Sequence, residues 1–189
     1  MKYQEGNMVK KRFRNIFVLI LAGLLSFISC STDNNSKYLP QKLGDLSQAK
    51  VIQDKKATVI INNMHGKTLD DCKNYIAYYG SNDSKNILYV SVYESAEKAK
   101  ANIMNMAMKI SSGSSVFSPL TYSGMGHETS SGMGHDAHFE TDGMGLKHYF
   151  YRTDNILIWW QVEPDKAETT YNDLLKFDFS ALNKRVNKQ

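Results

Sequence analysis

Apolar side chains recur every three to four positions in three stretches of the chain, a spacing typical of amphipathic helices. Residues 54–66 begin with an aspartate suited to the N-cap and end with a glycine, which is common after a helix C-terminus. The β-branched run at 58–61 favours a strand instead. We predict a helix, because residues typical of a helix start and of a helix end flank the run. Residues 95–113 and 165–179 predict two further helices.

Other stretches are rich in aromatic and β-branched residues and predict strands. Residues 74–95 contain two such runs around a polar turn at 80–85. Three more strands are predicted at 137–142, 146–152 and 155–162, separated by short Gly- and Asn-containing turns. Each neighbouring pair is therefore expected to form an antiparallel hairpin.

The order of these elements is helix, two strands, helix, long loop, three strands, helix. The loop is predicted over residues 111–135, where thirteen of the 25 residues are Ser or Gly. Strands and helices do not alternate throughout, which argues against a doubly wound parallel sheet. We predict one α+β domain over residues 54–189, with an antiparallel sheet of about five strands and about three packed helices. Residues 37–53 carry a weak pattern and are interpreted as a lead-in to this domain.

The start of the chain has the pattern of an export signal. A basic cluster at residues 10–14 precedes residues 16–28, thirteen residues without a charge. As a helix this run spans roughly 20 Å, whereas a bilayer core is about 30 Å thick. A basic flank, a short apolar run and a small residue before a cysteine follow in the order expected of a cleaved signal. A buried core helix is the alternative interpretation.

The signal ends in "SFISC", which resembles the lipobox of bacterial lipoproteins, with Ser29 before Cys30 and Phe27 where Leu is more usual. The resemblance implies removal of residues 1–29 and diacylglyceryl attachment to Cys30, followed by acylation of the new amine. Residues 30–53 would then hold the lipidated cysteine, a polar tether and the lead-in. The expected location is a bacterial cell envelope, anchored to an inner or outer membrane. An ordinary secreted cysteine is the alternative for Cys30.

Removal of the signal changes the charge balance. Of the 23 Lys/Arg and 19 Asp/Glu residues, five and one lie within residues 1–29, so the remaining chain carries 18 of each. The sequence pI near 8.9 therefore reflects the signal and gives no indication of nucleic-acid binding. With Cys30 lipidated, Cys72 has no disulfide partner, and we interpret it as a small buried apolar residue.

The sequence lacks the short motifs of the common catalytic and cofactor sites. It contains no phosphate-binding Gly-rich loop ending in Lys-Ser/Thr, no Cys-x-x-Cys, no His-Glu-x-x-His and no Gly-x-Ser-x-Gly. A triad built from scattered Ser, His and Asp remains open, but nothing indicates one. Residues 143–152, "GMGLKHYFYR", resemble a strand of uncharacterised exported bacterial proteins, a resemblance that implies no activity.

Residues 125–138, here called the Met/His loop, carry the one candidate metal site. "GMGH" occurs twice, and thioether sulfur selects Cu(I) while imidazole suits copper and zinc. Copper is favoured over zinc because of the methionines. The alternative is a string of tight turns, since the third Gly-Met-Gly, at Gly143–Gly145, falls at a predicted hairpin turn. The candidate ligands are Met125, His127, Met133, His135 and His138.

Aromatic residues on the predicted strands offer a second kind of site. Adjacent Trp159 and Trp160 should point to opposite faces of the sheet, so some aromatics are expected at a surface able to bind a small ligand or a protein. Ordinary core packing is the alternative. The strand aromatics are Tyr75, Tyr78, Tyr79, Tyr89, Tyr93, Tyr149, Phe150, Tyr151, Trp159 and Trp160.

Three functional hypotheses follow. The first is a membrane-anchored envelope lipoprotein with a non-catalytic binding or accessory role toward a small ligand or a protein partner. The second is copper or zinc binding or buffering by the Met/His loop. The third is an unrecognised envelope enzyme.

Overall fold

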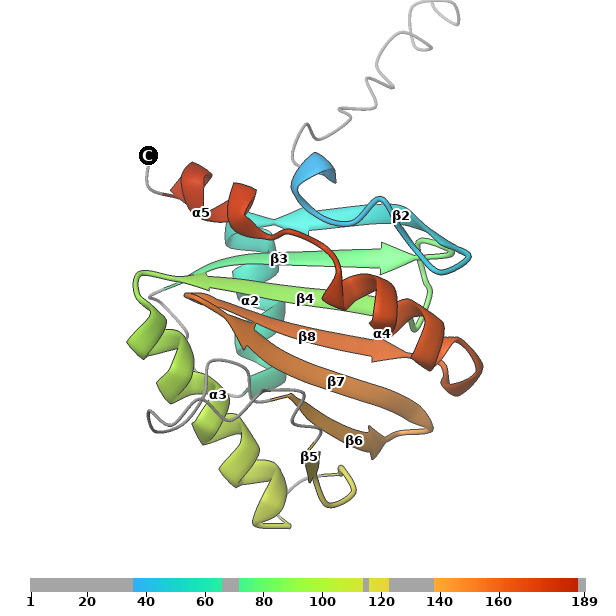
Figure 1. Cartoon of the computed structure of the whole chain (residues 1–189), viewed down its shortest axis with the longest axis vertical. Coiled ribbons are helices and arrows are strands. Elements are labelled where there is room, and N and C mark those ends of the chain that lie inside the picture. Colours follow the sequence, from blue (N-terminus) through green and yellow to red (C-terminus); the bar gives the residue numbers. More distant parts are fainter. Residues whose placement is uncertain (1–35, 66–71, 114–115, 123–137, 187–189) are drawn as a thin grey trace, which may run out of the picture. The chain divides into compact units, whose positions relative to one another are not determined.

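The strands of the protein form one antiparallel sheet (Figure 1). A computed structural model describes residues 36–65, 72–113, 116–122 and 138–186. Within these ranges the sheet has eight strands in the order β1-β2-β3-β4-β8-β7-β6-β5. They are β1 (Lys42–Leu43), β2 (Leu46–Gln53), β3 (Cys72–Tyr79), β4 (Ile87–Tyr93), β5 (Thr121–Tyr122), β6 (Phe139–Gly143), β7 (Leu146–Thr153) and β8 (Ile156–Val162).

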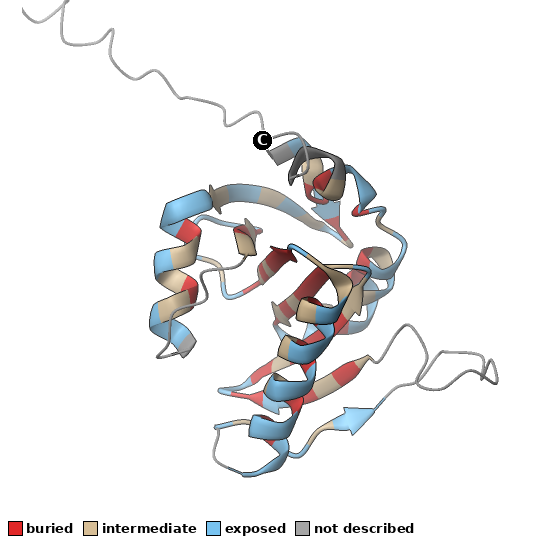
Figure 2. Cartoon of the chain, turned by 90° about the vertical axis from the view of Figure 1, so that its left-hand side faces the viewer, coloured by how far each residue is buried: buried red, intermediate tan, exposed pale blue. Residues whose placement is uncertain are grey.

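Helices cover both faces of this sheet. The described α-helices are α2 (Asp54–His65), α3 (Ala96–Ser111), α4 (Ala167–Leu175) and α5 (Ser180–Val186), with two 3₁₀ turns, η2 (Ser36–Tyr38) and η3 (Pro164–Lys166). Figure 1 shows α4 in front of the sheet and α2 behind it. In Figure 2 the central strands are largely buried, whereas the helices expose their outer sides.

The predicted α+β class is confirmed, and so is the helix over the β-branched run at 58–61. The predicted number of about five strands is wrong, because the described sheet has eight. The additional strands are β1 and β2, which lie in the supposed lead-in, and β5, which lies in the supposed loop. The first and last of these are two residues long, too short for any periodicity, and β2 has no fully buried residue, so its pattern is weak. A fourth helix, α5, also lies beyond the about three predicted.

One face of the sheet forms the larger core beneath α4 and α5. Alternate residues of β3 and β4 point to this face, among them Tyr75, Tyr79 and Val90. Trp160 is fully buried here, and its Nε1 donates a hydrogen bond to Oγ1 of Thr170 on α4 at 3.0 Å. The indole therefore gains packing without leaving its N–H unsatisfied.

The opposite face carries α2 and α3, each over its own cluster of buried residues. Ala57 and Ile61 of α2 pack near Ile76 of β3. The buried stripe of α3, which includes Ile103 and Ile110, packs toward β7 and β8. Ser95 caps α3, since its Oγ accepts a hydrogen bond from the Lys98 backbone N–H at 3.3 Å. The two helices thus cover different parts of the face and leave the strands between them less covered.

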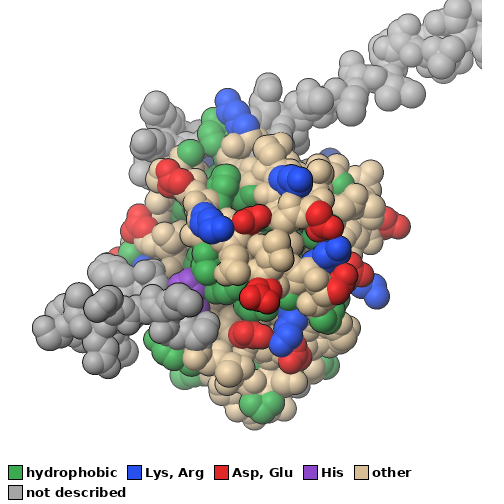
Figure 3. All heavy atoms as spheres, turned by 45° about the vertical axis from the view of Figure 1, so that its right-hand side comes forward, with side chains coloured by type: hydrophobic (Ala, Val, Ile, Leu, Met, Phe, Trp, Pro, Cys, Tyr) green, Lys and Arg blue, Asp and Glu red, His purple; other side chains and the backbone are tan. Residues whose placement is uncertain are grey.

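The predicted signal and Cys30 lie outside the described residues. No helix in the described part of the chain is long and apolar enough to cross a membrane. On the face drawn in Figure 3, acidic and basic side chains are interspersed over the surface. That distribution agrees with the equal numbers of the two charge types after residue 29.

Candidate functional site

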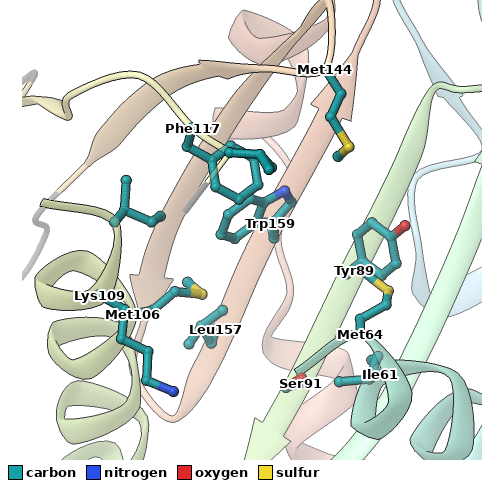
Figure 4. Close-up of a pocket in the computed structure, with 12 residues that line it drawn as sticks. Ile61, Met64, Tyr89, Ser91, Met106, Lys109, Phe117, Met144, Leu157 and Trp159 are labelled. Carbon is teal, nitrogen blue, oxygen red and sulfur yellow. The ribbon is translucent and has the colours of Figure 1, made fainter. Parts of the chain in front are cut away.

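A cleft of about 600 Å³ lies between α2 and α3, with β4 and β8 as its floor (Figure 4). Twelve described residues line it, and ten of them are apolar or aromatic. The two polar lining residues are Ser91 and Lys109. A mostly apolar concavity of this size with a few polar groups is the usual form of a small-molecule site. We call it the apolar cleft.

The floor of the apolar cleft follows from the register of β4 and β8. Tyr89 pairs with Trp159, and two positions further along Ser91 pairs with Leu157. Successive side chains of a strand alternate between faces, so these four residues all point to the α2–α3 side. Ser91 is small, which leaves depth at its end of the floor.

Several walls of the apolar cleft expose large apolar side chains to solvent. Met64 on α2 is 58% exposed, Val116 is 72% exposed and Met144 is 69% exposed. Scattered surface apolar residues are ordinary, but a contiguous group around one concavity indicates a surface that is covered by a ligand or partner. Met64 lies at the rim of the cleft, because α2 packs mainly on β3 and leaves this position beyond the covered strands.

Trp159 is part of the floor of the apolar cleft, and contacts with neighbouring side chains fix the orientation of its ring. Its ring stacks on Phe150 with centroids 4.9 Å apart and planes 7° apart. Its Nε1 donates to Nδ1 of His148 at 3.1 Å, and because an indole N–H can only donate, Nδ1 must be unprotonated. Nε2 of His148 then donates to the Gly143 carbonyl oxygen at 3.1 Å.

Burial keeps this imidazole neutral. It lowers the pKa of His148 below the ordinary value, while the Gly143 carbonyl and the Asp142 carboxylate act in the opposite direction. The Phe117 ring meets His148 edge-on at 4.9 Å between centroids and lies 5.6 Å from Trp159. The three rings therefore form one rigid aromatic corner of the apolar cleft.

The Ser91 end of the apolar cleft rests on a buried polar network. Ser91 Oγ donates to Oδ1 of Asn74 at 2.7 Å, and Asn74 Nδ2 donates to Oγ1 of Thr58 at 3.1 Å. Asn74 is fully buried, so these bonds satisfy an amide that water cannot reach. The Cys72 thiol also donates to Asn74 Oδ1 at 3.5 Å. Cys72 is half-buried, so the interpretation of this residue as a buried apolar one is wrong.

Of the predicted metal ligands, only His138 lies within the described residues. Its Nδ1 is 2.7 Å from the Tyr171 hydroxyl, and its ring stacks on Tyr151 with centroids 4.9 Å apart. Tyr151 belongs to the core under α4, on the opposite face from the apolar cleft. In the described part of the chain, no group of three or more His, Cys, Asp or Glu side chains could hold a metal ion. Four predicted ligands lie outside the described residues: Met125, His127, Met133 and His135.

The third Gly-Met-Gly is a hairpin turn, as predicted. Gly143 pairs with Leu146 at the end of the β6–β7 hairpin, and the two turn residues have positive φ, 52° at Met144 and 76° at Gly145. The turn also has a role that the sequence pattern did not indicate, because it carries Met144 to the rim of the apolar cleft. Of the strand aromatics, Tyr89 and Trp159 line that cleft.

Comparisons of the chain with known protein families, with curated proteins and with solved structures gave no match. The apolar cleft is therefore interpreted from its own chemistry.

Proposed function

We propose that this chain is a lipid-anchored protein of a bacterial cell envelope whose α+β domain binds an apolar ligand in the apolar cleft, without catalysing a reaction. The observation that carries the proposal is the cleft itself, an open concavity of about 600 Å³ with ten apolar or aromatic lining residues. Water in contact with such a surface is released when a ligand covers it, and this release is the main driving force for binding.

The chemistry of the lining favours binding over catalysis. Among the described residues that line the apolar cleft, none is a carboxylate, an imidazole or a thiol. Ser91 directs its hydroxyl hydrogen to the Asn74 amide oxygen, which is not a base able to activate a nucleophile. His148 lies behind Trp159, and its acceptor nitrogen is occupied by the indole N–H.

Lipid attachment at Cys30 would place the domain at a membrane surface, where amphiphilic ligands are concentrated. The lipobox-like "SFISC" and the polar "STDNNS" segment after Cys30 support this part of the proposal. Bacteria expressing the chain with labelled palmitate should incorporate the label, and Cys30→Ser should abolish incorporation. Equal labelling of both chains would contradict attachment at this residue.

Binding is tested with N-phenyl-1-naphthylamine, a neutral probe whose fluorescence rises in apolar surroundings. All described elements lie in one compact unit, Asn34–Gln189, so a chain that begins at Ser31 retains them. The chain offers a matched pair of variants, because Met64 and Met108 are both 58% exposed and only Met64 lines the apolar cleft. We expect Met64→Asp to weaken probe binding at least tenfold and Met108→Asp to leave it unchanged. Equal affinities for the two variants would refute binding at the cleft.

A further inference from the structure

The floor of the apolar cleft includes the last ring of an aromatic stack that crosses the neighbouring strands. The rings of Phe139 on β6 and Phe150 on β7 are stacked with centroids 4.9 Å apart and planes 15° apart, and Phe150 is stacked in turn on Trp159 of β8. The two residues of each pair lie directly opposite each other in the strand register. Phe150 is therefore covered on both ring faces, and it is fully buried.

Trp159 has a stacked neighbour on one ring face alone. Phe150 lies on the β7 side, so the other face of the indole looks toward β4, the strand on the opposite side of β8. The residue paired with Trp159 on β4 is Tyr89. The ring contacts of Trp159 are with Phe117, His148 and Phe150, and in the described part of the chain none joins it to Tyr89. Both rings line the cleft, and Figure 4 shows them apart from each other. The stack thus ends at an open, half-buried indole.

The groups around this open face suit a flat ligand. The indole N–H is directed to His148, so Trp159 presents the π face of its ring to the cleft. Three methionines also line the cleft: Met64 on α2, Met106 on α3 and Met144 in the β6–β7 turn. Thioether sulfur makes favourable contacts with the edges of aromatic rings, and its unbranched side chain adapts to the shape of a ligand. A planar aromatic ring is the ligand shape that uses both kinds of group.

The lining gives a charged ligand little support. No carboxylate lines the cleft in the described part of the chain, so a cation stacked on the indole would lose water without gaining an anionic partner. Lys109, the charged residue of the lining, already takes part in another interaction. We therefore expect a ligand without a net charge.

We propose that the ligand of the apolar cleft is a neutral planar aromatic molecule, which binds on the face of Trp159 turned toward β4 and so continues the stack of Phe139 and Phe150. The proposal rests on the proposed binding function and adds the chemical class of the ligand. Aromatic pairs are more stable than the burial of their area alone accounts for, by an amount that corresponds to about a two- to tenfold gain in affinity. A saturated molecule with the same carbon skeleton would not have this gain.

The test compares 2-naphthol with decahydro-2-naphthol, which has the same carbon skeleton and hydroxyl group but no flat ring. Each is titrated calorimetrically into the chain that begins at Ser31. Burial of apolar surface alone predicts that the saturated ligand binds at least as tightly as the aromatic one. We expect 2-naphthol to bind about two- to tenfold more tightly, with its ring protons shifted upfield in NMR spectra by the indole ring current. Equal affinities, tighter binding of the saturated ligand or the lack of an upfield shift would overturn the aromatic assignment.

Two leucine variants identify the ring that is responsible. Trp159→Leu keeps an apolar side chain but removes the flat face, so it should abolish the preference for 2-naphthol. Tyr122 contacts Phe139 at the other end of the stack, is 65% exposed and lies outside the cleft lining, so Tyr122→Leu should keep the preference. A preference that survives Trp159→Leu would overturn the proposal. The affinity ratio and the upfield shift are measured on the unmodified chain, so they decide the proposal even if Trp159→Leu does not fold.

The proposed binding function is tested separately by the same titrations. If both naphthols bind with equal affinity and Met64→Asp abolishes their binding, the aromatic assignment is overturned but the cleft is supported as a binding site. No binding of either naphthol or of N-phenyl-1-naphthylamine would instead refute the proposed function.

Discussion

Replacing Gly143 with alanine would place a methyl group too close to the Phe117 ring. A Cβ at Gly143 would lie 2.3 Å from Cδ1 and 2.7 Å from Cε1 of that ring. Carbon atoms in optimal contact are about 3.5–4.0 Å apart, so one of the two groups has to move. The backbone is held on both sides: Gly143 pairs with Leu146, and the Ser118 backbone N–H donates to the Asp142 carbonyl oxygen at 2.8 Å. The ring is therefore the part that yields.

The cost in stability follows from the contacts that the Phe117 ring would lose. Phe117 would lose its edge-on contact with His148 and its tilted contact with Trp159. Aromatic pairs contribute about 0.5–1.5 kcal/mol each, and overpacking of a well-packed site costs about 1–3 kcal/mol. We therefore expect Gly143→Ala to lower the free energy of unfolding by about 2 kcal/mol. In urea unfolding followed by tryptophan fluorescence, the midpoint should fall while the slope m stays constant.

A double-mutant cycle identifies the cause. In a Phe117→Ala background the ring is absent, and the cost of Gly143→Ala should nearly vanish. Gly145→Ala is the control: Gly145 has a φ of 76° and nothing within 4 Å of a Cβ, so its cost of about 1 kcal/mol is conformational and should be equal in both backgrounds. If Gly143→Ala is as costly without the ring as with it, the steric explanation is refuted.

Three further outcomes are expected. Because burial lowers the pKa of His148, the imidazole is protonated in the unfolded chain at a higher pH than in the folded chain, so the free energy of unfolding decreases as the pH falls from about 6.5 toward the lowered pKa. Urea titrations across pH 7 to 5 should show a shallower decrease in His148→Gln. Identical slopes for the two chains would contradict a buried, neutral His148. Asn74→Leu should cost about 1–3 kcal/mol in thermal unfolding, because the buried Ser91 hydroxyl and the half-buried Thr58 hydroxyl both lose this partner, whereas Ser91→Ala should cost only about 1 kcal/mol. Equal losses would argue against a shared network. If the alternative hypothesis of a metal site in the Met/His loop is correct, titration with Cu(I) or with Zn(II) should show submicromolar binding that is lost when four residues of the loop are replaced together by alanine; equal weak binding by both chains would reject that site. The four are Met125, His127, Met133 and His135.

The local sequence pattern was sufficient to predict the elements that are long enough to show a complete hydrophobic period. The helix of residues 96–111 has a cap and a buried stripe within one segment, and the β6–β7 hairpin has its turn residues in place. Both could be predicted because their stabilising contacts are close in sequence. Strand β2 could not be predicted in this way, because most of its side chains remain outside the core although it pairs with β3 on one side and with the two-residue β1 on the other.

The apolar cleft could not be predicted in the same way. Met64, Met144 and Trp159 are far apart in the chain, and each has an ordinary local explanation as a helix, turn or strand residue. Only the placement of α2 and α3 over different strands leaves a gap between them, and only the β4–β8 register brings Ser91 and Trp159 to its floor. A short-range sequence pattern cannot encode the distance between two helices that lie 31 or more residues apart in the chain.

The sequence by itself determined the α+β class, the hairpins, the opposite orientations of Trp159 and Trp160, and the expectation of a lipid anchor at Cys30. These depend on the period of the backbone and on short segments, where neighbours in sequence are neighbours in space. The tertiary structure decided how many strands join the sheet and which apolar residues stay uncovered. Burial is a property of the whole packed molecule, so the same methionine is core in one arrangement of helices and the rim of a cleft in another.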